Sequence, residues 1–172
     1  AGTALGNLRD HRVPLSKLHL SSALKVRPTP EVRTALRAFA DDIYFHQVIE
    51  RRKDKSIRRI RDLDVALRET PLNADSDGAE WRIHFHIPLH SQPTELFDTT
   101  SDHIVAVLDE LARNPALCQH LEMETYTWEV LPEAIKNRDV VDQLVGEYEW
   151  TLARLAERGL SPRASSGLGS NV

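Results

Sequence analysis

The chain has 172 residues, 41% of them hydrophobic and 28% charged, which is an ordinary composition for a soluble globular protein of one domain. Its formal net charge of −4 gives no electrostatic reason to expect a nucleic acid or an anionic membrane as a partner. No apolar run approaches the roughly 20 residues that cross a bilayer, and the first residues do not read as a signal peptide. The single cysteine excludes an intramolecular disulfide and suits a reducing compartment, so we expect a cytoplasmic protein.

Two stretches differ from the rest of the chain in composition and charge. Residues 51–61 are strongly basic, and we interpret them as the solvated charges of a hairpin, with a phosphate-binding loop as the alternative. Residues 161–172 are rich in Ser and Gly and poor in large apolar residues, so we expect a disordered tail there. One domain is therefore expected to cover residues 1–160.

Strand-like and helix-like segments alternate along the chain. In chain order the pattern predicts a strand at 17–22, a helix at 31–40, a hairpin at 43–60, a helix at 62–68, a strand at 80–89, a helix at 101–113, a strand at 120–127 and a helical region at 132–158. Thr29 and Asp62 are expected to cap the first two helices.

The last helical region carries an apolar stripe whose spacing is typical of a helix that buries one face. We therefore expect the residues of this stripe to face the core: Val140, Val141, Leu144, Val145, Tyr148, Leu152 and Leu155.

Three of the predicted strands share an unusual feature, because apolar side chains alternate in them with polar side chains that can bind metals or move protons. The polar residues are Lys17, His19 and Ser21 in the first strand, Arg82, His84 and His86 in the second, and Glu122 and Glu124 in the third. A period of two places the polar residues of each strand on one face. We expect the three polar faces to converge on one site.

Strands that alternate with helices favour a parallel sheet, since parallel strands need crossover connections. Doubly wound sheets bury both faces and read as continuous apolar runs, which these strands do not. Polar residues on one face fit the interior of a (β/α) barrel better. Three strands cannot close such a barrel, so the expected fold class is α/β, either an open sheet or a partial TIM (β/α)8 barrel.

Four blocks of the sequence resemble the C-terminal part of the EboE-type metabolite traffic proteins, which belong to the xylose isomerase-like TIM barrel superfamily. The blocks are KLHLSSAL at 17–24, HQVIERR at 46–52, WRIHFHIPL at 81–89, and LEMETYTW at 121–128 followed by Leu131-Pro132. The resemblance extends from about Leu8 to Leu155. It implies that this chain supplies the last three βα units of the barrel, strands six to eight, with a hairpin inserted after the first helix.

In that superfamily a divalent metal lies at the C-terminal mouth of the barrel, bound by Glu, Asp and His side chains from several strands. By position, the resemblance implies His19, His84, His86 and Glu124 as metal ligands in this chain, although His84 stands where the wider pattern often has Asp. A mixture of imidazole and carboxylate suits Zn²⁺, Mn²⁺ or Fe²⁺. The alternative is a polar interior without metal, in which the same side chains hydrogen-bond with one another.

Glu122 and Glu124 are the candidate catalytic residues. They share a strand face, so one carboxylate could bind the metal while the other transfers a proton. We favour Glu124 as the ligand and a supporting role for Glu122. Equally, one of the two could pair with Lys17 or Arg82 in the interior.

The resemblance implies a protein of metabolite traffic or processing, similar to sugar phosphate isomerases and epimerases, that acts on a small polyhydroxylated metabolite with a divalent metal. One alternative is a non-enzymatic carrier that binds the metabolite without changing it. Another is a metal-dependent phosphoesterase of the endonuclease-IV-like kind, which the acidic charge of the chain disfavours. Because three strands leave two open edges, we also expect self-association through those edges.

Overall fold

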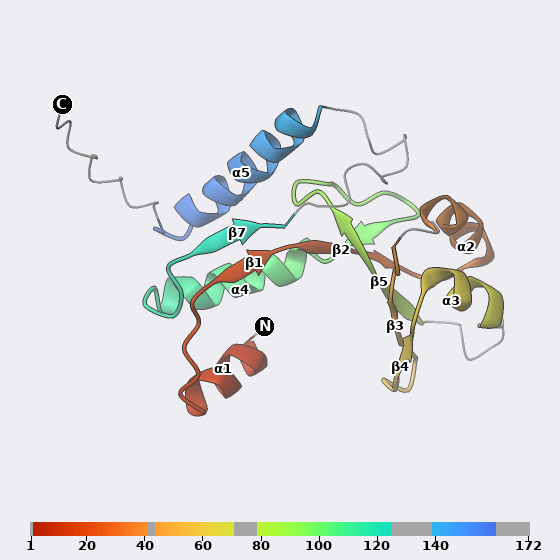
Figure 1. Ribbon diagram of the computed structural model, residues 1–172, viewed down its shortest axis with the longest axis horizontal. Helices are drawn as coiled ribbons and strands as arrows, with labels where there is room; N and C mark the ends of the chain where they lie inside the picture. Colours follow the sequence, from red (N-terminus) through yellow and green to blue (C-terminus); the bar gives the residue numbers. More distant parts are fainter. Residues whose placement is uncertain (1, 41–43, 71–78, 125–138, 161–172) are drawn as a thin grey trace.

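The structure is a computed structural model and describes residues 2–40, 44–70, 79–124 and 139–160 (Figure 1). Its helices are α1 (Gly2–Asp10), α2 (Pro30–Leu36), the 3-10 helix η1 (Arg37–Phe39), α3 (Leu63–Glu69), α4 (Ser101–Arg113) and α5 (Val140–Ala156). Its strands are β1 (Leu18–Leu20), β2 (Ser22–Val26), β3 (Val48–Arg51), β4 (Ile57–Ile60), β5 (Glu80–Ile87), β6 (Asp98–Thr99) and β7 (Leu121–Met123).

The described strands form two sheets. β1 and β7 make a two-stranded parallel sheet, whereas the other strands make a five-stranded sheet in the order β4-β3-β5-β2-β6, in which every pair is antiparallel. The fold is therefore mixed α/β with one parallel and one antiparallel sheet, and neither sheet closes on itself.

One extended segment belongs to both sheets. Only Ser21 separates β1 from β2, so the chain passes directly from the parallel sheet into the antiparallel one (Figure 1). Leu20 packs in an apolar cluster with Leu108 of α4, whereas Leu24 packs in a second cluster with Trp81 of β5. The segment thus connects two apolar clusters as well as two sheets.

The predicted parallel arrangement of three neighbouring strands is present only for β1 and β7. The first predicted strand is divided into β1 and β2, and the second, β5, runs antiparallel to β2, with Ser22 opposite Ile87. The third, β7, lies directly beside β1, with His19 opposite Glu122. A period of two shows which side chains share a face, but it does not specify which strand is the neighbour or how that neighbour runs.

The hairpin predicted over 43–60 is present as β3 and β4, with Val48 opposite Ile60. It is not a separate insertion, because β3 also pairs with β5 and thereby continues the antiparallel sheet. Ile60 packs into the apolar cluster around Trp81, together with residues of α2 and α3. Both helices therefore cover the same face of this sheet.

The predicted helix caps are confirmed. Thr29 Oγ1 accepts a hydrogen bond from the backbone N–H of Val32 at 3.3 Å, at the start of α2. Asp62 Oδ1 accepts from the backbone N–H of Leu63 at 2.7 Å, at the start of α3. The helix predicted over 101–113 has the bounds of α4.

The predicted orientation of the last helix is wrong. Five residues of the apolar stripe on α5 are exposed, and Val141 is 62% exposed. The buried residues of α5 are polar: Gln143, Glu147 and Thr151. Glu147 Oε1 accepts a hydrogen bond from the backbone N–H of Leu89 at 3.1 Å, which fixes this polar face against the rest of the fold.

The polar face of α5 can turn inward because Gly146 lets the helix approach His90 closely. A Cβ atom added to Gly146 would lie 3.1 Å from Cε1 of His90, so the glycine lets α5 pack closely against the loop after β5. Arg158 Nε also donates to Asp109 Oδ1 of α4 at 2.7 Å. Specific polar contacts therefore determine the orientation of the helix, although the apolar stripe alone would favour the opposite one.

Some predictions fall outside the described residues. These are the tail at 161–172, the end of the third strand at 125–127 and the beginning of the last helical region at 132–138. None of the described helices combines the length and the apolar character that a bilayer crossing requires.

We expect Glu147→Ala to lower the free energy of unfolding by about 1–3 kcal/mol, because the buried N–H of Leu89 would lose its acceptor. The matched change Glu149→Ala, on the exposed face of α5, should alter the free energy by less than about 0.5 kcal/mol. Urea unfolding followed by circular dichroism measures both values. Equal effects of the two changes would contradict the described orientation of α5.

Candidate functional site

The candidate site lies where the two sheets meet. β5 ends beside Ser21, the residue that joins β1 to β2, because Ser22 stands opposite Ile87. The backbone N–H of Glu124, just after β7, donates to the carbonyl of Leu20 at 3.1 Å. The end of β5 and the end of β7 are therefore both hydrogen-bonded to the segment around Ser21.

His86 is held at this junction by both sheets. It is 5% exposed, and its Nδ1 lies 3.0 Å from the carbonyl oxygen of Glu124 and 3.1 Å from Oγ of Ser21. A carbonyl oxygen only accepts hydrogen bonds, so Nδ1 of His86 carries the proton. The Nε2 atom of His86 is then left with its lone pair.

That lone pair faces a second imidazole. Nε2 of His86 lies 3.1 Å from Nε2 of His84, and the ring centroids are 5.1 Å apart. The two residues are separated by one position in β5, so they share a strand face as predicted. The register shift between Ala23 and Leu24 lies opposite this part of β5 and brings the end of the strand close to Ser21.

Burial lowers the pKa of His84 below its ordinary value of 6.5, and the neighbouring His86 lowers it further. Glu124 opposes the shift, and His46 adds to it. His84 is therefore neutral at pH 7, and a neutral imidazole can bind a cation or accept a proton.

The carboxylates reach the site from the parallel sheet. In the register of β1 and β7, His19 lies between them: its Nε2 is 3.6 Å from Oε2 of Glu122, and its Nδ1 is 3.8 Å from Oε2 of Glu124. Lys17 Nζ pairs with Oε1 of Glu122 at 2.8 Å, and this hydrogen bond lowers the pKa of the Glu122 carboxyl. The pairing with Lys17 is one of the alternatives that the sequence leaves open.

The structure thus brings the predicted site residues into one region, but not into a formed metal site. Two imidazole nitrogens bound to one tetrahedral Zn²⁺ at about 2.0–2.1 Å lie roughly 3.3 Å apart, close to the spacing of the His84 and His86 Nε2 atoms. Within residues 2–40, 44–70, 79–124 and 139–160, however, no three His, Cys, Asp or Glu side chains are grouped so that they could hold a metal ion. The histidine pair fits two ligand positions, and the side chain of Glu124 would have to turn toward it to supply a third.

Sequence reasoning missed two contributors. The sequence indicates Ser21 only as one of the alternating polar residues, yet its hydroxyl contacts His86 at the junction. His46 falls within the hairpin predicted over 43–60, and it is 1% exposed. Its Nδ1 lies 3.2 Å from the carbonyl of His84 and donates to it. Only the register of β3 against β5 reveals this contact.

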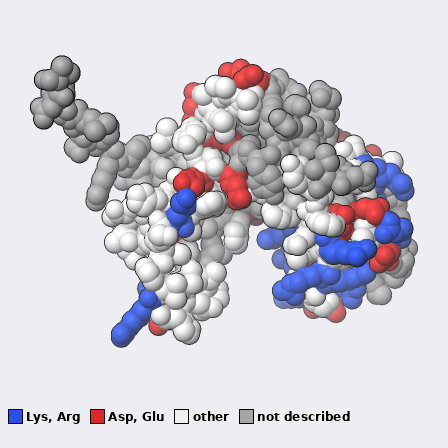
Figure 2. Space-filling view, viewed as in Figure 1, with Lys and Arg blue, Asp and Glu red and all other residues white. Residues whose placement is uncertain are grey.

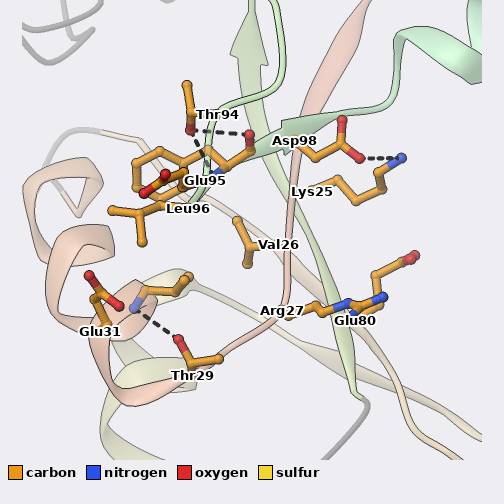
Figure 3. A pocket seen from close by; sticks show the side chains of 12 residues that line it. Lys25, Val26, Arg27, Thr29, Glu31, Glu80, Thr94, Glu95, Leu96 and Asp98 are labelled. Carbon is orange, nitrogen blue, oxygen red and sulfur yellow. Dashed lines mark hydrogen bonds and ion pairs between the residues drawn. The ribbon is translucent and has the colours of Figure 1, made fainter.

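A cavity of about 560 Å³ lies away from the histidines, beside β2 and α2 (Figure 3). Val26 and Leu96 line it, and Lys25 and Asp98 form an ion pair of 3.0 Å at its edge (Figure 3). Its charged residues already include paired ones, and it contains none of the converging imidazoles. We therefore regard the histidine junction, and not this cavity, as the candidate functional site.

The chain matches no protein-family model, and searches of the curated proteins and of the solved structures find no significant match.

The lowered pKa of His84 makes the stability of the fold depend on pH. Below the ordinary value of 6.5 the unfolded chain binds more protons than the folded one, so the free energy of unfolding should fall as the pH drops below that value. We expect His84→Gln to reduce this loss. Urea unfolding midpoints measured at a series of pH values below 7 test the expectation, and an unchanged pH dependence in the variant would contradict it.

Proposed function

We propose that the histidine junction binds a divalent cation, Zn²⁺, Mn²⁺ or Fe²⁺, together with a small polyhydroxylated metabolite. The spacing of 3.1 Å between Nε2 of His84 and Nε2 of His86 carries this proposal. The proton on Nδ1 of His86 supports it, because a hydrogen bond from the second ring nitrogen to a carbonyl is the usual support for a metal-binding imidazole. Glu124 and His19 are the further ligands that the sequence predicts.

The side chains around the pair have distinct roles in this proposal. A bound divalent cation would polarise a carbonyl or hydroxyl oxygen of the metabolite. Glu124, whose Oε2 lies 3.8 Å from Nδ1 of His19 and whose charge acts on His84, either completes the ligand set or moves a proton. Glu122 is kept ionised by Lys17, so its lowered pKa makes it a weak base that is better suited to accept a hydrogen bond from a hydroxyl group.

A metal that polarises the substrate and a carboxylate that moves a proton are the parts of an isomerase or epimerase. We therefore propose this activity, in metabolite traffic or processing, and we also propose a family for the chain. We propose that the chain is the C-terminal part of an EboE-type protein with a xylose isomerase-like barrel, active in the cytoplasm. The sequence blocks quoted above and the parallel pair β1–β7 support this assignment. The antiparallel pairing of β2 with β5 does not, since consecutive strands of such a barrel run parallel.

A non-enzymatic carrier is the second candidate function, and the openness of the site favours it. The side chains of His19 and Glu122 are 50% and 51% exposed. A carrier needs only to bind its metabolite, whereas most proton transfers to carbon take place in sites that exclude water. Partners in either case are a small molecule and, through open strand edges, further copies of the chain.

Metal content tests the binding step. We expect the purified chain to hold about one equivalent of Zn²⁺, Mn²⁺ or Fe²⁺ by elemental analysis after incubation and desalting, and His84→Ala/His86→Ala to lose it, because the pair supplies two ligands. The matched control is His11→Ala/His103→Ala, which removes two exposed histidines elsewhere. Retention by the first variant, or absence of metal from the parent chain, would contradict the proposal.

Turnover separates the enzyme from the carrier. The metal-loaded chain is incubated in D₂O with a panel of aldoses, ketoses and polyols, and deuterium incorporation at carbon is followed by NMR. An isomerase or epimerase exchanges a carbon-bound proton through its base, so incorporation is expected in the parent and is expected to fall at least about a hundredfold in Glu124→Gln. Binding with neither deuterium incorporation nor a new isomer in the spectrum would identify a carrier, because a direct hydride shift between carbons forms the isomer without exchange.

A further inference from the structure

The hairpin of β3 and β4 concentrates the positive charge of the molecule. Residues 51–61 contain seven Lys or Arg and one Asp, a net charge of +6. The whole chain carries −4, so the remaining residues carry −10. Figure 2 shows Lys and Arg side chains gathered over the part of the molecule that contains β3 and β4. The negative net charge of the whole chain argues against a polyanionic partner, but it does not describe the surface of this hairpin.

Some cationic side chains of the hairpin form pairs within the fold, and others do not. Arg51 pairs with Glu80 at 2.9 Å, and Arg52 pairs with Glu50 at 3.2 Å. Arg58 reaches the hydroxyl of Thr70 at 3.4 Å. The side chains of the other cations are exposed and make no hydrogen bond or ion pair within the described ranges: Lys53, Lys55, Arg59 and Arg61.

Arg59 and Arg61 share one face of the hairpin, and the other two free cations lie in its turn. Ile60 points into the apolar cluster and Arg58 toward Thr70, so Arg59, which alternates with them, lies on the opposite face of the hairpin. Lys53 and Lys55 lie in the turn, beyond both strands. A flexible polyanion can follow cations that continue from a strand into a turn.

An exposed aromatic ring lies at the base of the same hairpin. Phe45 is 77% exposed, more than any other exposed large hydrophobic residue of the described chain. The next residue, His46, donates its backbone N–H to Oδ1 of Asp62 at 3.0 Å, so Phe45 and Arg61 are each one residue away from this hydrogen bond. An aromatic face beside a row of cations is the arrangement on which bases stack while phosphates are neutralised.

We propose that this hairpin binds single-stranded nucleic acid without sequence preference. Lys53, Lys55, Arg59 and Arg61 contact the phosphates, and Phe45 stacks on one base. Arginine suits this role because its planar guanidinium can bind two phosphate oxygens at once. The proposal is independent of the histidine junction and of the metal proposed there.

Edge-strand protection is the simpler role for these charges. β4 is an edge strand of the five-stranded sheet, and charged side chains on such a strand prevent it from pairing with other chains. That role does not require an exposed Phe45 at the base or a free Arg61 beyond the end of β4. If it were the only role, the chain would not bind an oligonucleotide.

Fluorescence anisotropy with a labelled oligothymidylate of about ten nucleotides tests the proposal at low salt. We expect Arg59→Ala/Arg61→Ala to weaken binding by roughly tenfold or more, and to reduce the slope of log K against log salt by about 1.4, since each lost phosphate contact contributes about 0.7. The control Arg12→Ala/Arg27→Ala removes two exposed cations elsewhere and should change the affinity by less than about twofold. Equal losses in both pairs would overturn the proposal.

Phe45 provides a second and independent readout. We expect Phe45→Ala to weaken binding about tenfold, because stacking on one base is lost, whereas Phe45→Trp should retain it. The introduced indole should also be quenched when the oligonucleotide binds, which a structural role of Phe45 would not produce. Tighter binding to a DNA duplex of the same length, binding only to vesicles that contain anionic lipid, or no binding to either would each overturn the proposal.

Discussion

The extended segment Leu18–Val26 is the constraint on which the rest of the structure depends. Its first part pairs with β7 in parallel, and its second part pairs with β5 and β6 in antiparallel. Leu20 and Leu24 lie in different apolar clusters. Because the segment is hydrogen-bonded along both parts, the relative position of the two sheets is determined at Ser21. The polar residues of the candidate site are distributed around this point, with His86 on one side and His19 on the other.

Local chemistry made much of the secondary structure predictable. The Thr29 and Asp62 caps and both bounds of α4 follow from short-range patterns, and the structure confirms them. The direction of β5 and the orientation of α5 do not follow from such patterns. Strand direction depends on hydrogen bonds between distant segments, and α5 is oriented by a carboxylate, Glu147, that finds a buried partner in Leu89 N–H. Neither fact is encoded in the periodicity of one segment.

In the candidate site too, some features follow from local sequence patterns and others depend on contacts between distant segments. That His84 and His86 share a face follows from their spacing of two in β5, and that His19 and Glu122 are neighbours follows from the pairing of β1 with β7. The contact between Ser21 Oγ and Nδ1 of His86 depends on a register shift, and the burial of His46 depends on the third strand of the sheet. No single-sequence rule places them. Convergence of the three polar faces on one metal site stays a prediction, and of the parallel sheet on which it was based only the pair β1–β7 is present.

The junction at Ser21 also has a mechanical consequence. The imidazole pair moves with the antiparallel sheet, whereas the carboxylates of Glu122 and Glu124 move with β7 in the parallel sheet. The bond between Nδ1 of His86 and the carbonyl of Glu124, 3.0 Å long, links these two groups of donors across the joint. Loss of that one bond would therefore separate the imidazoles from the carboxylates while both ladders stayed intact.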